Sequence, residues 1–295
     1  MPSDRAAGRP LHAALAERLP ELTGIVSRAA AAILAIAPDR LDLRHKADLS
    51  PVTLADEAAE AVILRGLAQV APGVPVVSEE ACGEGRSPPP GASFILVDPL
   101  DGTREFVAGR GEYTVNLAVI ADGVPVIGLI AAPAQGMIWR GVCGRGAERL
   151  RLEPGAEPGD AREIVAIHPR PSPAAGLVAA VSRSHFDPRS AALLASLPIT
   201  GQIVCGSSVK FCRIAEGAAD LYPRLARTCE WDIAAGHAIL AAAGGCVTDP
   251  DGAALVYGRG GHGFHVPGFI AWSSPSLAAA SLGGPTTRSG LHGPL

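Results

Sequence analysis

Long apolar segments, an apolar leader and a surplus of basic residues are all missing from this 295-residue chain. Its longest uncharged apolar runs, 29–37 and 238–247, span 9 and 10 residues. A membrane-spanning helix needs about 20 such residues. The N-terminal Met-Pro-Ser-Asp-Arg has no apolar signal core. We therefore expect no integral membrane segment and a cytoplasmic protein, with peripheral association with the inner membrane left open.

The formal net charge is −4 and the pI is about 6.1, whereas proteins that bind nucleic-acid polymers usually carry a basic surplus. We therefore expect no nucleic-acid partner. The six cysteines form no C-x-x-C pair and no zinc-ribbon spacing, which makes a zinc site unexpected. Lysine is scarce as well: the sequence has only two lysines, Lys46 and Lys210, and all its other Lys or Arg positions are arginines. Because an ammonium and a guanidinium bind differently, both lysines are candidate functional residues.

With 48% hydrophobic and 18% charged residues, the chain has enough apolar side chains to fold. Helical spacing predicts helices over 11–37 and from 53 to about 70, and short apolar runs predict strands over 74–78, 94–97, 115–120, 124–131 and 137–142. Strands and helices then alternate to about 243. We expect an α+β domain over 1–157, an α/β domain over 158–275 and a flexible tail over 276–295.

The strongest chemical pattern is an apolar run that ends in Asp98-Pro-Leu-Asp101-Gly-Thr103. A continuous apolar run is typical of a strand buried on both faces, and ligands often bind at the carboxyl ends of such strands. Two buried carboxylates a few ångströms apart repel each other, unless a cation lies between them. Mg²⁺ is such a cation, and it prefers oxygen ligands.

Further acidic residues stand at comparable positions. Glu79 and Glu80 follow the strand over 74–78, and Asp232 precedes an apolar helix. Together with Asp98 and Asp101, these carboxylates predict a site for two or three Mg²⁺ ions, an arrangement suited to phosphoryl transfer. Each feature also has a structural alternative, such as a turn, a solvated edge or a helix cap.

A haloacid-dehalogenase type of phosphatase is a rival interpretation, because its strand ends in D-x-D-G-T. The spacing here is D-x-x-D-G-T, from Asp98 to Thr103. The additional residue turns the second carboxylate away from the position of a general acid. The spacing therefore disfavours this rival.

The chain resembles the Mg²⁺-dependent, lithium-sensitive inositol monophosphatase superfamily in Asp98-Pro-Leu-Asp101-Gly-Thr103, Ser78-Glu79-Glu80 and Trp231-Asp232-Ile-Ala-Ala-Gly236. In detail it looks like the bacterial 3'(2'),5'-bisphosphate nucleotidases of the CysQ type. The segments that carry this finer resemblance are 46–56, 101–106, 111–116, 181–185, 206–212, 215–217 and 220–224. The likeness extends over about residues 25–272, with the motifs in the expected order.

The resemblance implies a metal site and a catalytic pair. The implied metal ligands are Glu79, Asp98, Asp101, Asp232 and the carbonyl of Leu100. Glu80 would not bind the metal directly but would support these ligands. Thr103 and Asp56 would orient and deprotonate the attacking water, whose pKa the metal must lower because threonine is a weak base.

The resemblance also implies the residues that contact the substrate. The backbone N–H groups of Gly102 and Thr103 would receive the phosphate that is cleaved. The other phosphate or the ribose would face Ser207, Ser208 and Lys210, and Asp232 would contact the substrate as well as the metal. Lys46, His185 and Arg224 complete the set of candidate residues.

The implied fold is a layered αβαβα sandwich, often a homodimer. The implied reaction removes the 3'-phosphate of adenosine 3',5'-bisphosphate (PAP) to give AMP and phosphate, by in-line attack of a metal-activated water. This step supports sulfate assimilation, and 3'-phospho-5'-adenylyl sulfate (PAPS) is a second implied substrate.

Two alternatives stay open. An inositol-1-phosphate or sugar bisphosphate phosphatase of the same superfamily would share the metal centre, although segments 206–212 and 220–224 favour a nucleotide. A non-catalytic nucleotide-binding relative would have lost a metal ligand or Thr103, whereas every expected position is filled.

Overall fold

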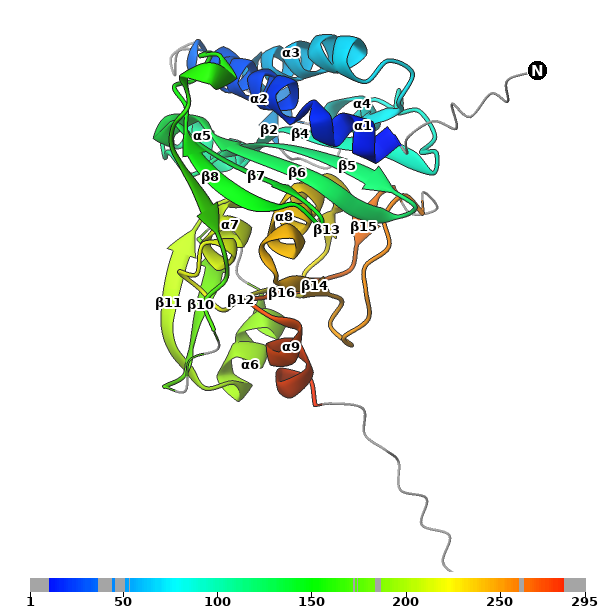
Figure 1. Cartoon of the computed structure of the whole chain (residues 1–295). Coiled ribbons are helices and arrows are strands. Elements are labelled where there is room, and N and C mark those ends of the chain that lie inside the picture. The colour runs from blue at the N-terminus through cyan, green and yellow to red at the C-terminus, as the bar shows by residue number, and fades with distance from the viewer. Residues whose placement is uncertain are drawn as a thin grey trace, which may run out of the picture.

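The computed structural model describes residues 11–36, 44–45, 51–52, 54–171, 173, 175–183, 187–259 and 263–283. Its elements stack in five layers: helices, a seven-stranded sheet, helices, a five-stranded sheet and a last pair of helices (Figure 1). This is the αβαβα sandwich that the family resemblance implied. Three hydrophobic clusters fill the spaces between successive layers.

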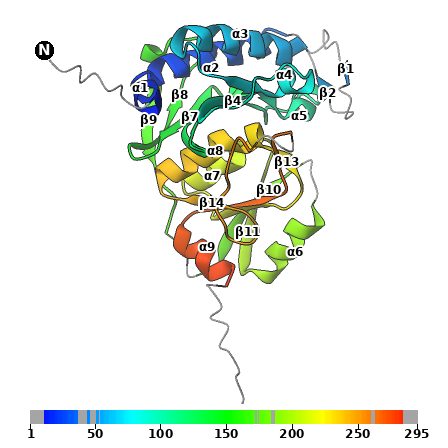
Figure 2. The same cartoon turned by 90° about the vertical axis from the view of Figure 1, so that its right-hand side faces the viewer.

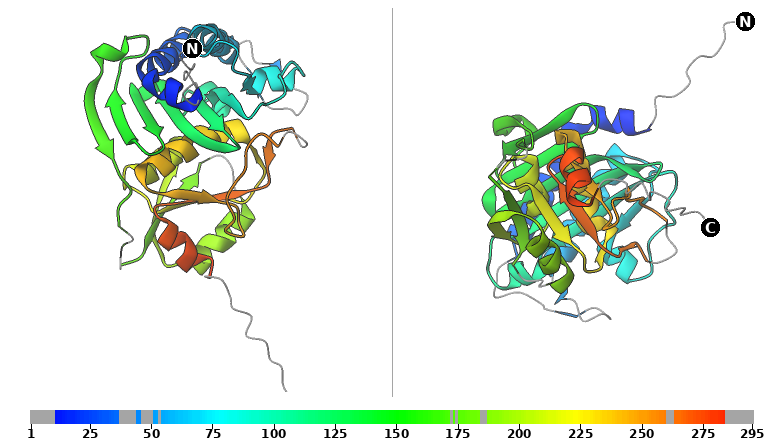
Figure 3. Two further views of the ribbon diagram at one scale, coloured as in Figure 1. Left: turned by 45° about the vertical axis from the view of Figure 1, so that its right-hand side comes forward. Right: turned by 90° about the horizontal axis from the view of Figure 1, so that it is seen from below.

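The first layer consists of α1 (Leu11–Glu17), α2 (Leu19–Leu34) and α3 (Leu54–Val70). The inner face of α2 buries Leu22, Ile25, Val26, Ala29 and Ile33 completely, at the spacings of three and four residues typical of a helix that packs on a sheet. These helices cover one face of the seven-stranded sheet (Figure 3, left).

The seven strands lie in sequence order in the sheet. They are β3 (Val76–Ser78), β4 (Ser93–Asp101), β5 (Thr114–Ala121), β6 (Val124–Ala132), β7 (Met137–Val142), β8 (Gly146–Arg151) and β9 (Arg162–Ile167). Only β3 and β4 are parallel, and the other neighbours are antiparallel. The expected hairpin at Ala-Asp-Gly is confirmed: Asp122 and Gly123 both adopt positive φ between β5 and β6, as a two-residue hairpin turn requires.

The middle layer holds α7 (Val209–Ala215) and α8 (Glu230–Ala243). Because α8 lies between the two sheets (Figure 2), it is apolar on nearly all sides. Its backbone approaches β6 and β7 at two glycines. A Cβ atom on Gly128 would lie 2.2 Å from the Ala235 carbonyl oxygen, and one on Gly141 would lie 2.9 Å from the Cα of Ile239.

The five-stranded sheet has the order β11-β10-β12-β16-β14. The bounds are β10 (Leu177–Ser182), β11 (Ile199–Cys205), β12 (Leu221–Arg224), β14 (Cys246–Thr248) and β16 (Phe269–Trp272). Strand β10 is parallel to β11 and β12, whereas β16 is antiparallel to β12 and β14. The last layer, α6 (Pro188–Ser196) and α9 (Pro275–Ser281), lies on its outer side (Figure 3, right).

Short elements complete the chain. They are β1 (Arg44–His45), β2 (Pro51–Val52), α4 (Glu79–Gly83), α5 (Thr103–Val107), β13 (Thr228–Cys229), β15 (His265–Val266) and two 3-10 turns, Pro133–Gln135 and Pro158–Asp160. The expected helix start at Thr53 lies outside the described residues, and α3 begins at Leu54.

The division into domains at residue 157 stays a prediction. Strand β9 follows that position but pairs with β8 in the first sheet. The expected tail begins with structure rather than irregular chain: Ser274 caps α9 by accepting the N–H of Leu277, whose side chain is buried. The part of the tail beyond residue 283 lies outside the described residues. In the part that is described, none of the helices is both long and apolar enough to span a bilayer.

We expect Gly128→Ala to destabilise the protein by about 1–3 kcal/mol, because the added methyl group pushes α8 away from β6. Urea unfolding measures this change. Gly159→Ala is the matched control, since a Cβ atom there meets nothing within 4 Å. Equal unfolding midpoints for the two variants would contradict the close packing of α8.

Candidate functional site

The carboxyl ends of several strands meet at one cavity, which we call the acidic cavity. Strands β3 and β4 are parallel, and Ser78 pairs with Val97. The next residues of the two strands, Glu79 and Asp98, therefore come to the same place in the first sheet. Asp232, near the start of α8, reaches the same place. The cavity has a volume of about 520 Å³, and Glu79, Asp98, Leu100, Asp101, Thr103 and Asp232 are among its lining residues.

Strand β4 is irregular where it enters this cavity. Its pairing with β5 shifts register between Asp98 and Asp101, around Pro99, which has no N–H group to offer the ladder. The Asp98 side chain is 1% exposed, and its carboxylate accepts the N–H of Leu100 at 3.0 Å. The irregularity places Asp98, the Leu100 carbonyl and Asp101 in one short segment at the cavity.

Asp101 has a strongly perturbed carboxyl group. Burial, with a further contribution from the negative charge of Asp232, raises the pKa of Asp101 to about 7, against the opposing charges of Lys210 and Arg224. Burial also raises the pKa of the Cys229 thiol, and so do the charges of Asp232, Glu79 and Asp98. These effects indicate that carboxylates from three elements converge on one region of the cavity.

Asp232 has a structural role as well as a place in the cavity. One of its oxygens accepts the Thr228 hydroxyl and, at 3.1 Å, the N–H of Cys229. This arrangement closes a capping box at the start of α8. Asp232 therefore acts as a helix cap, as the structural alternative predicted, and it also lines the cavity.

The two adjacent glutamates differ in position. They form the first turn of α4, where Ser78 caps the helix by accepting the N–H of Ala81. Glu79 lines the cavity, whereas Glu80 is buried and is not among the lining residues. Glu60 of α3, which the sequence did not indicate, accepts the Ser78 hydroxyl and fixes the start of α4.

The donor set suits a hard cation such as Mg²⁺, because it consists of carboxylate and carbonyl oxygens and because the Asp101 carboxyl is destabilised as an anion. Among the described residues, no three His, Cys, Asp or Glu side chains already stand in a group that could hold a metal ion. The oxygens thus share a cavity without a completed coordination shell.

Thr103 and Asp56 form a hydrogen-bonded pair beside these carboxylates. The Thr103 hydroxyl lies 3.3 Å from a carboxylate oxygen of Asp56 and 3.2 Å from the Leu100 carbonyl. Asp56 is 2% exposed in the first turn of α3. Gly102, with φ of 96°, caps α5, and a Cβ atom there would approach the Glu112 carbonyl oxygen to 3.2 Å. The absence of a side chain at Gly102 therefore allows this close approach to the backbone at Glu112.

The loop from Cys205 to Ser208 brings Gly206 and Ser207 to the same cavity. Ser207 adopts φ of 46°, unusual for a residue with a side chain, and its buried hydroxyl has no hydrogen-bond partner among the described residues. The Lys210 ammonium, buried at 2% exposure, donates to the carbonyl oxygens of Ser207 and Cys205. Lys210 and Ser207 both line the cavity.

Ser208 does not line the cavity. Its hydroxyl contacts that of Thr114 at 2.8 Å and donates to the Asn116 amide oxygen at 2.7 Å. It therefore anchors the loop to β5, and its expected contact with substrate stays a prediction.

Arg224 lines the cavity as well, and within the described part of the chain its buried Nε atom has no hydrogen-bond partner. Lys46 and His185 lie outside the described residues. Two residues inside the resembling segments 111–116 and 181–185 were not singled out from the sequence. Glu112 and Arg183 form a bidentate ion pair with N···O distances of 2.7 and 2.8 Å, and Arg183 lines the cavity.

Comparison with known proteins agrees with this geometry. Residues 15–280 match the inositol monophosphatase family. The chain is 40% identical over 232 residues to the 3'(2'),5'-bisphosphate nucleotidases CysQ of Shigella flexneri and Escherichia coli K12, over 74% of this chain and 83% of each relative.

Solved structures give the same result. CysQ from Bacteroides thetaiotaomicron, a bacterial member of the inositol monophosphatase family, has a TM-score of 0.70 and 33% identity, and the match covers 85% of this chain and 95% of that one. Inositol monophosphatase from Anabaena has the same fold, with a TM-score of 0.69 and 23% identity, over 91% and 96% of the two chains.

The resemblance inferred from the sequence motifs is thus confirmed, together with the layered fold. Enzymes of this family are metal-dependent phosphatases, generally with Mg²⁺. The match covers nearly all of the described layers and every motif of the acidic cavity. The chain belongs to the inositol monophosphatase family.

Proposed function

We propose that this protein is a Mg²⁺-dependent 3'(2'),5'-bisphosphate nucleotidase that removes the 3'-phosphate of PAP to give AMP and phosphate, with PAPS as a second substrate, in sulfate assimilation. Its 40% identity to the CysQ nucleotidases over 74% of the chain supports this assignment.

The observation that carries the proposal is that one cavity is lined by both carboxylates and cations. Glu79, Asp98, Asp101 and Asp232 line it together with Lys210 and Arg224, and the two cations lie close enough to Asp101 to lower its pKa. A phosphate next to bound metal ions would be held at the carboxylates. A second anionic group, such as the other phosphate of a nucleotide bisphosphate, would be held by the two cations.

Five groups would hold the metal: the carboxylates of Glu79, Asp98, Asp101 and Asp232, and the carbonyl of Leu100. They have enough oxygens for two or three ions when water completes the coordination. When bound, Mg²⁺ supplies Lewis-acid chemistry, which lowers the pKa of a water and neutralises the charge that develops on the phosphate. Glu80, buried beside Glu79, would support the ligand wall.

Thr103 and Asp56 would orient the attacking water and take its proton. The Thr103 hydroxyl donates its hydrogen toward Asp56 or the Leu100 carbonyl, so its lone pairs can accept a hydrogen bond from the water. Asp56, which is buried and whose carboxylate lies 3.3 Å from that hydroxyl, would receive the proton.

The remaining candidates would bind the substrate. The N–H groups of Gly102 and Thr103 would face the phosphate that is cleaved, with Asp232 next to the ribose. Ser207, Lys210 and Arg224 would contact the second phosphate. Ser208 would act through the loop that it anchors, and Lys46 and His185 stay predicted contacts.

We further propose that the protein is a homodimer, the oligomeric state that the family resemblance implies, and that it is located in the cytoplasm. Size-exclusion chromatography with light scattering tests the first, and cell fractionation tests the second.

Phosphate release from PAP and from inositol-1-phosphate, measured in parallel with Mg²⁺, tests the assignment. We expect a preference for PAP, inhibition by lithium, and a loss of about a hundredfold or more in Asp101→Asn because a metal ligand is removed. Mg²⁺ should also raise the Tm of the wild type but not of Asp101→Asn.

A preference for inositol-1-phosphate would contradict the substrate while leaving the metal centre intact. Release from neither substrate, together with a Tm that ignores Mg²⁺, would favour the non-catalytic alternative.

Thr103→Ala should lower kcat for PAP by roughly 10²–10⁴-fold with a small change in KM, because the water loses its orienting group but the phosphate contacts persist. Thr103→Ser, which keeps the hydroxyl, should retain most of the activity. Steady-state kinetics separates the two constants, and equal losses in the alanine and serine variants would argue against this role of the hydroxyl.

A further inference from the structure

A cysteine and a histidine face each other at the acidic cavity. Cys229 on β13 pairs with His265 on β15 across two antiparallel strands, and the Cys229 thiol lies 3.4 Å from Nδ1 of His265. Both residues line the cavity. Neither has a role in the proposed hydrolysis, and sulfur is not a ligand that Mg²⁺ prefers.

The separation of these two atoms fits a tetrahedral metal ion. Zinc binds cysteine sulfur at about 2.3 Å and histidine nitrogen at about 2.0–2.1 Å, so a tetrahedral angle places the sulfur and the nitrogen about 3.5–3.6 Å apart. The 3.4 Å between Cys229 and His265 is close to this value. Because the pairing of β13 with β15 holds both backbones, an ion can bind the two side chains with little movement of either strand.

The surrounding charges favour a cation at this pair. Burial, and then the charges of Asp232, Glu79 and Asp98, raise the pKa of the Cys229 thiol, which indicates that these carboxylates lie near the sulfur. The same negative charges attract a divalent cation, and the cation in turn stabilises the thiolate. Binding breaks the S–H bond, the electron pair of the thiolate is donated to the metal, and the proton leaves to solvent.

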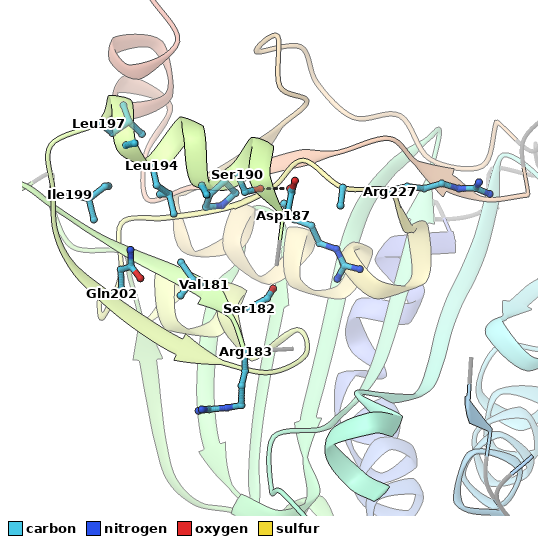
Figure 4. Close-up of a pocket in the computed structure, with 15 residues that line it drawn as sticks. Val181, Ser182, Arg183, Asp187, Ser190, Leu194, Leu197, Ile199, Gln202 and Arg227 are labelled. Atoms are coloured by element: carbon cyan, nitrogen blue, oxygen red, sulfur yellow. Dashed lines mark hydrogen bonds between the residues drawn. The ribbon is translucent and has the colours of Figure 1, made fainter. Parts of the chain in front are cut away.

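His265 is in the protonation state that binds a metal. Burial, followed by the positive charge of Arg227, lowers the pKa of its imidazole, so the ring is neutral at pH 7 and keeps one nitrogen unprotonated. Arg227 lines the acidic cavity and also the pocket beside α6. In Figure 4 it stands at the opposite side of that pocket from Leu197. Because His265 is exposed, an ion can reach it directly from solvent.

We propose that Cys229 and His265 bind a thiophilic divalent cation such as Zn²⁺, and that this ion inhibits the enzyme. Among the described residues no third His, Cys, Asp or Glu stands with them in a metal-binding group, so water completes the coordination. The ion would lie next to Asp232, whose carboxylate accepts the N–H of Cys229 at 3.1 Å. Its charge would compete with Mg²⁺ for that carboxylate. The inhibitory effect, but not the metal site, rests on the proposed function.

Co²⁺ and Zn²⁺, added to the full chain with Mg²⁺ in excess, test the site without any substrate. A Co²⁺ ion bound to a thiolate absorbs light by sulfur-to-metal charge transfer, and we expect this band in the wild type but not in Cys229→Ser. Competition with a chromophoric chelator should show Zn²⁺ binding weakened roughly tenfold or more in Cys229→Ser and in His265→Gln. Cys143→Ser is the matched control, since Cys143 is exposed and does not line the cavity.

Inhibition of PAP hydrolysis tests the effect of the ion. Zn²⁺ should inhibit the wild type at concentrations roughly tenfold or more below those that inhibit Cys229→Ser. Inhibition by Ca²⁺, which prefers oxygen ligands, should be the same in both proteins. Serine is itself a good N-cap, so it can replace Cys229 at the start of α8 without loss of the cap.

Equal Co²⁺ spectra and equal Zn²⁺ affinities in the wild type and Cys229→Ser would overturn the metal site. Weakened binding without a change in Zn²⁺ inhibition would overturn the inhibitory role. Absence of PAP hydrolysis by the wild type would instead contradict the proposed function, and the Co²⁺ spectrum would still test the site. His265→Gln, at an exposed position, provides the test if Cys229→Ser does not fold.

A second, independent observation concerns Asn116, a buried residue of β5. Asn116 pairs with Asp98 across the β4–β5 ladder, and residues directly opposite each other have Cβ atoms about 4.5–5.5 Å apart. Leu96 and Ala118, two residues away on the two strands, belong to the hydrophobic cluster that contains the inner residues of α8. Since side chains alternate along a strand, Asn116 and Asp98 point to the same side of the sheet.

Asn116 has a hydrogen-bond donor that the described residues leave unused. Its Oδ1 accepts the Ser208 hydroxyl at 2.7 Å, whereas its buried Nδ2 has no partner in the described part of the chain. A buried donor without a partner costs free energy. We infer that Asn116 is a positioning residue, whose Nδ2 donates to the Asp98 carboxylate directly or through one water. It would thereby connect a proposed metal ligand to the loop that carries Ser207.

Asn116→Leu removes both polar atoms and roughly keeps the volume. We expect it to require roughly tenfold more Mg²⁺ for the half-maximal rise in Tm, because Asp98 loses its support. Ser208→Ala is the control, since it removes the contact with the loop but leaves Nδ2 in place. An equal loss of Tm at every Mg²⁺ concentration would reduce Asn116 to a structural residue. Asn116→Ala provides the same measurement if leucine does not fit.

Discussion

Burial of carboxylates close to one another is the constraint on which the site depends. Burial, with a further contribution from the charge of Asp232, destabilises the anionic form of Asp101, and the charges of Lys210 and Arg224 offset this only in part. The surrounding layers hold the carboxylates in place by ordinary means: a strand irregularity at Pro99, a serine cap at α4 and a capping box at α8. A cation bound between the carboxylates would stabilise their ionised forms, and this stabilisation would contribute to the affinity for the cation.

The same constraint explains why the acidic cavity is lined by parts of the chain far apart in sequence. A sheet edge and a helix start are held in place by packing elsewhere in the protein, so they can keep these carboxylates close together in spite of their repulsion. Helix α8 is central to this arrangement because it touches both sheets and carries Asp232. The glycines in β6 and β7 set how closely it can lie.

Much of this organisation could be predicted from the sequence. The apolar strand that ends in Asp98 and Asp101, the hairpin at Asp122 and Gly123, and the alternation in the second half all carry local signals. The family resemblance supplied the layered order of the sheets, which no local signal contains. Short helices such as α4 and α5 were missed because five residues are too few for a helical period to appear.

The residues that could not be predicted act through tertiary contacts. Glu60 lies in none of the motifs, and Glu112 lies in the resembling segment 111–116 without a role indicated there. Their contacts appear only when Ser78 and Gly206 are placed beside them. Ser208 shows the converse: a motif residue beside Ser207 turns its hydroxyl toward β5 instead of the cavity. Adjacent positions in a sequence can face opposite sides of a loop, and only packing decides which side each one faces.

The double use of Asp232 has a consequence for local motion. One carboxylate oxygen closes the first turn of α8, through Thr228 and Cys229, while the residue also faces the cavity. Fraying of that turn and release of an ion bound to Asp232 would then be coupled, because both require the Asp232 carboxylate to move. Amide exchange at the start of α8 would accordingly report on ion occupancy, and the helix would be slowest to open when the enzyme is loaded.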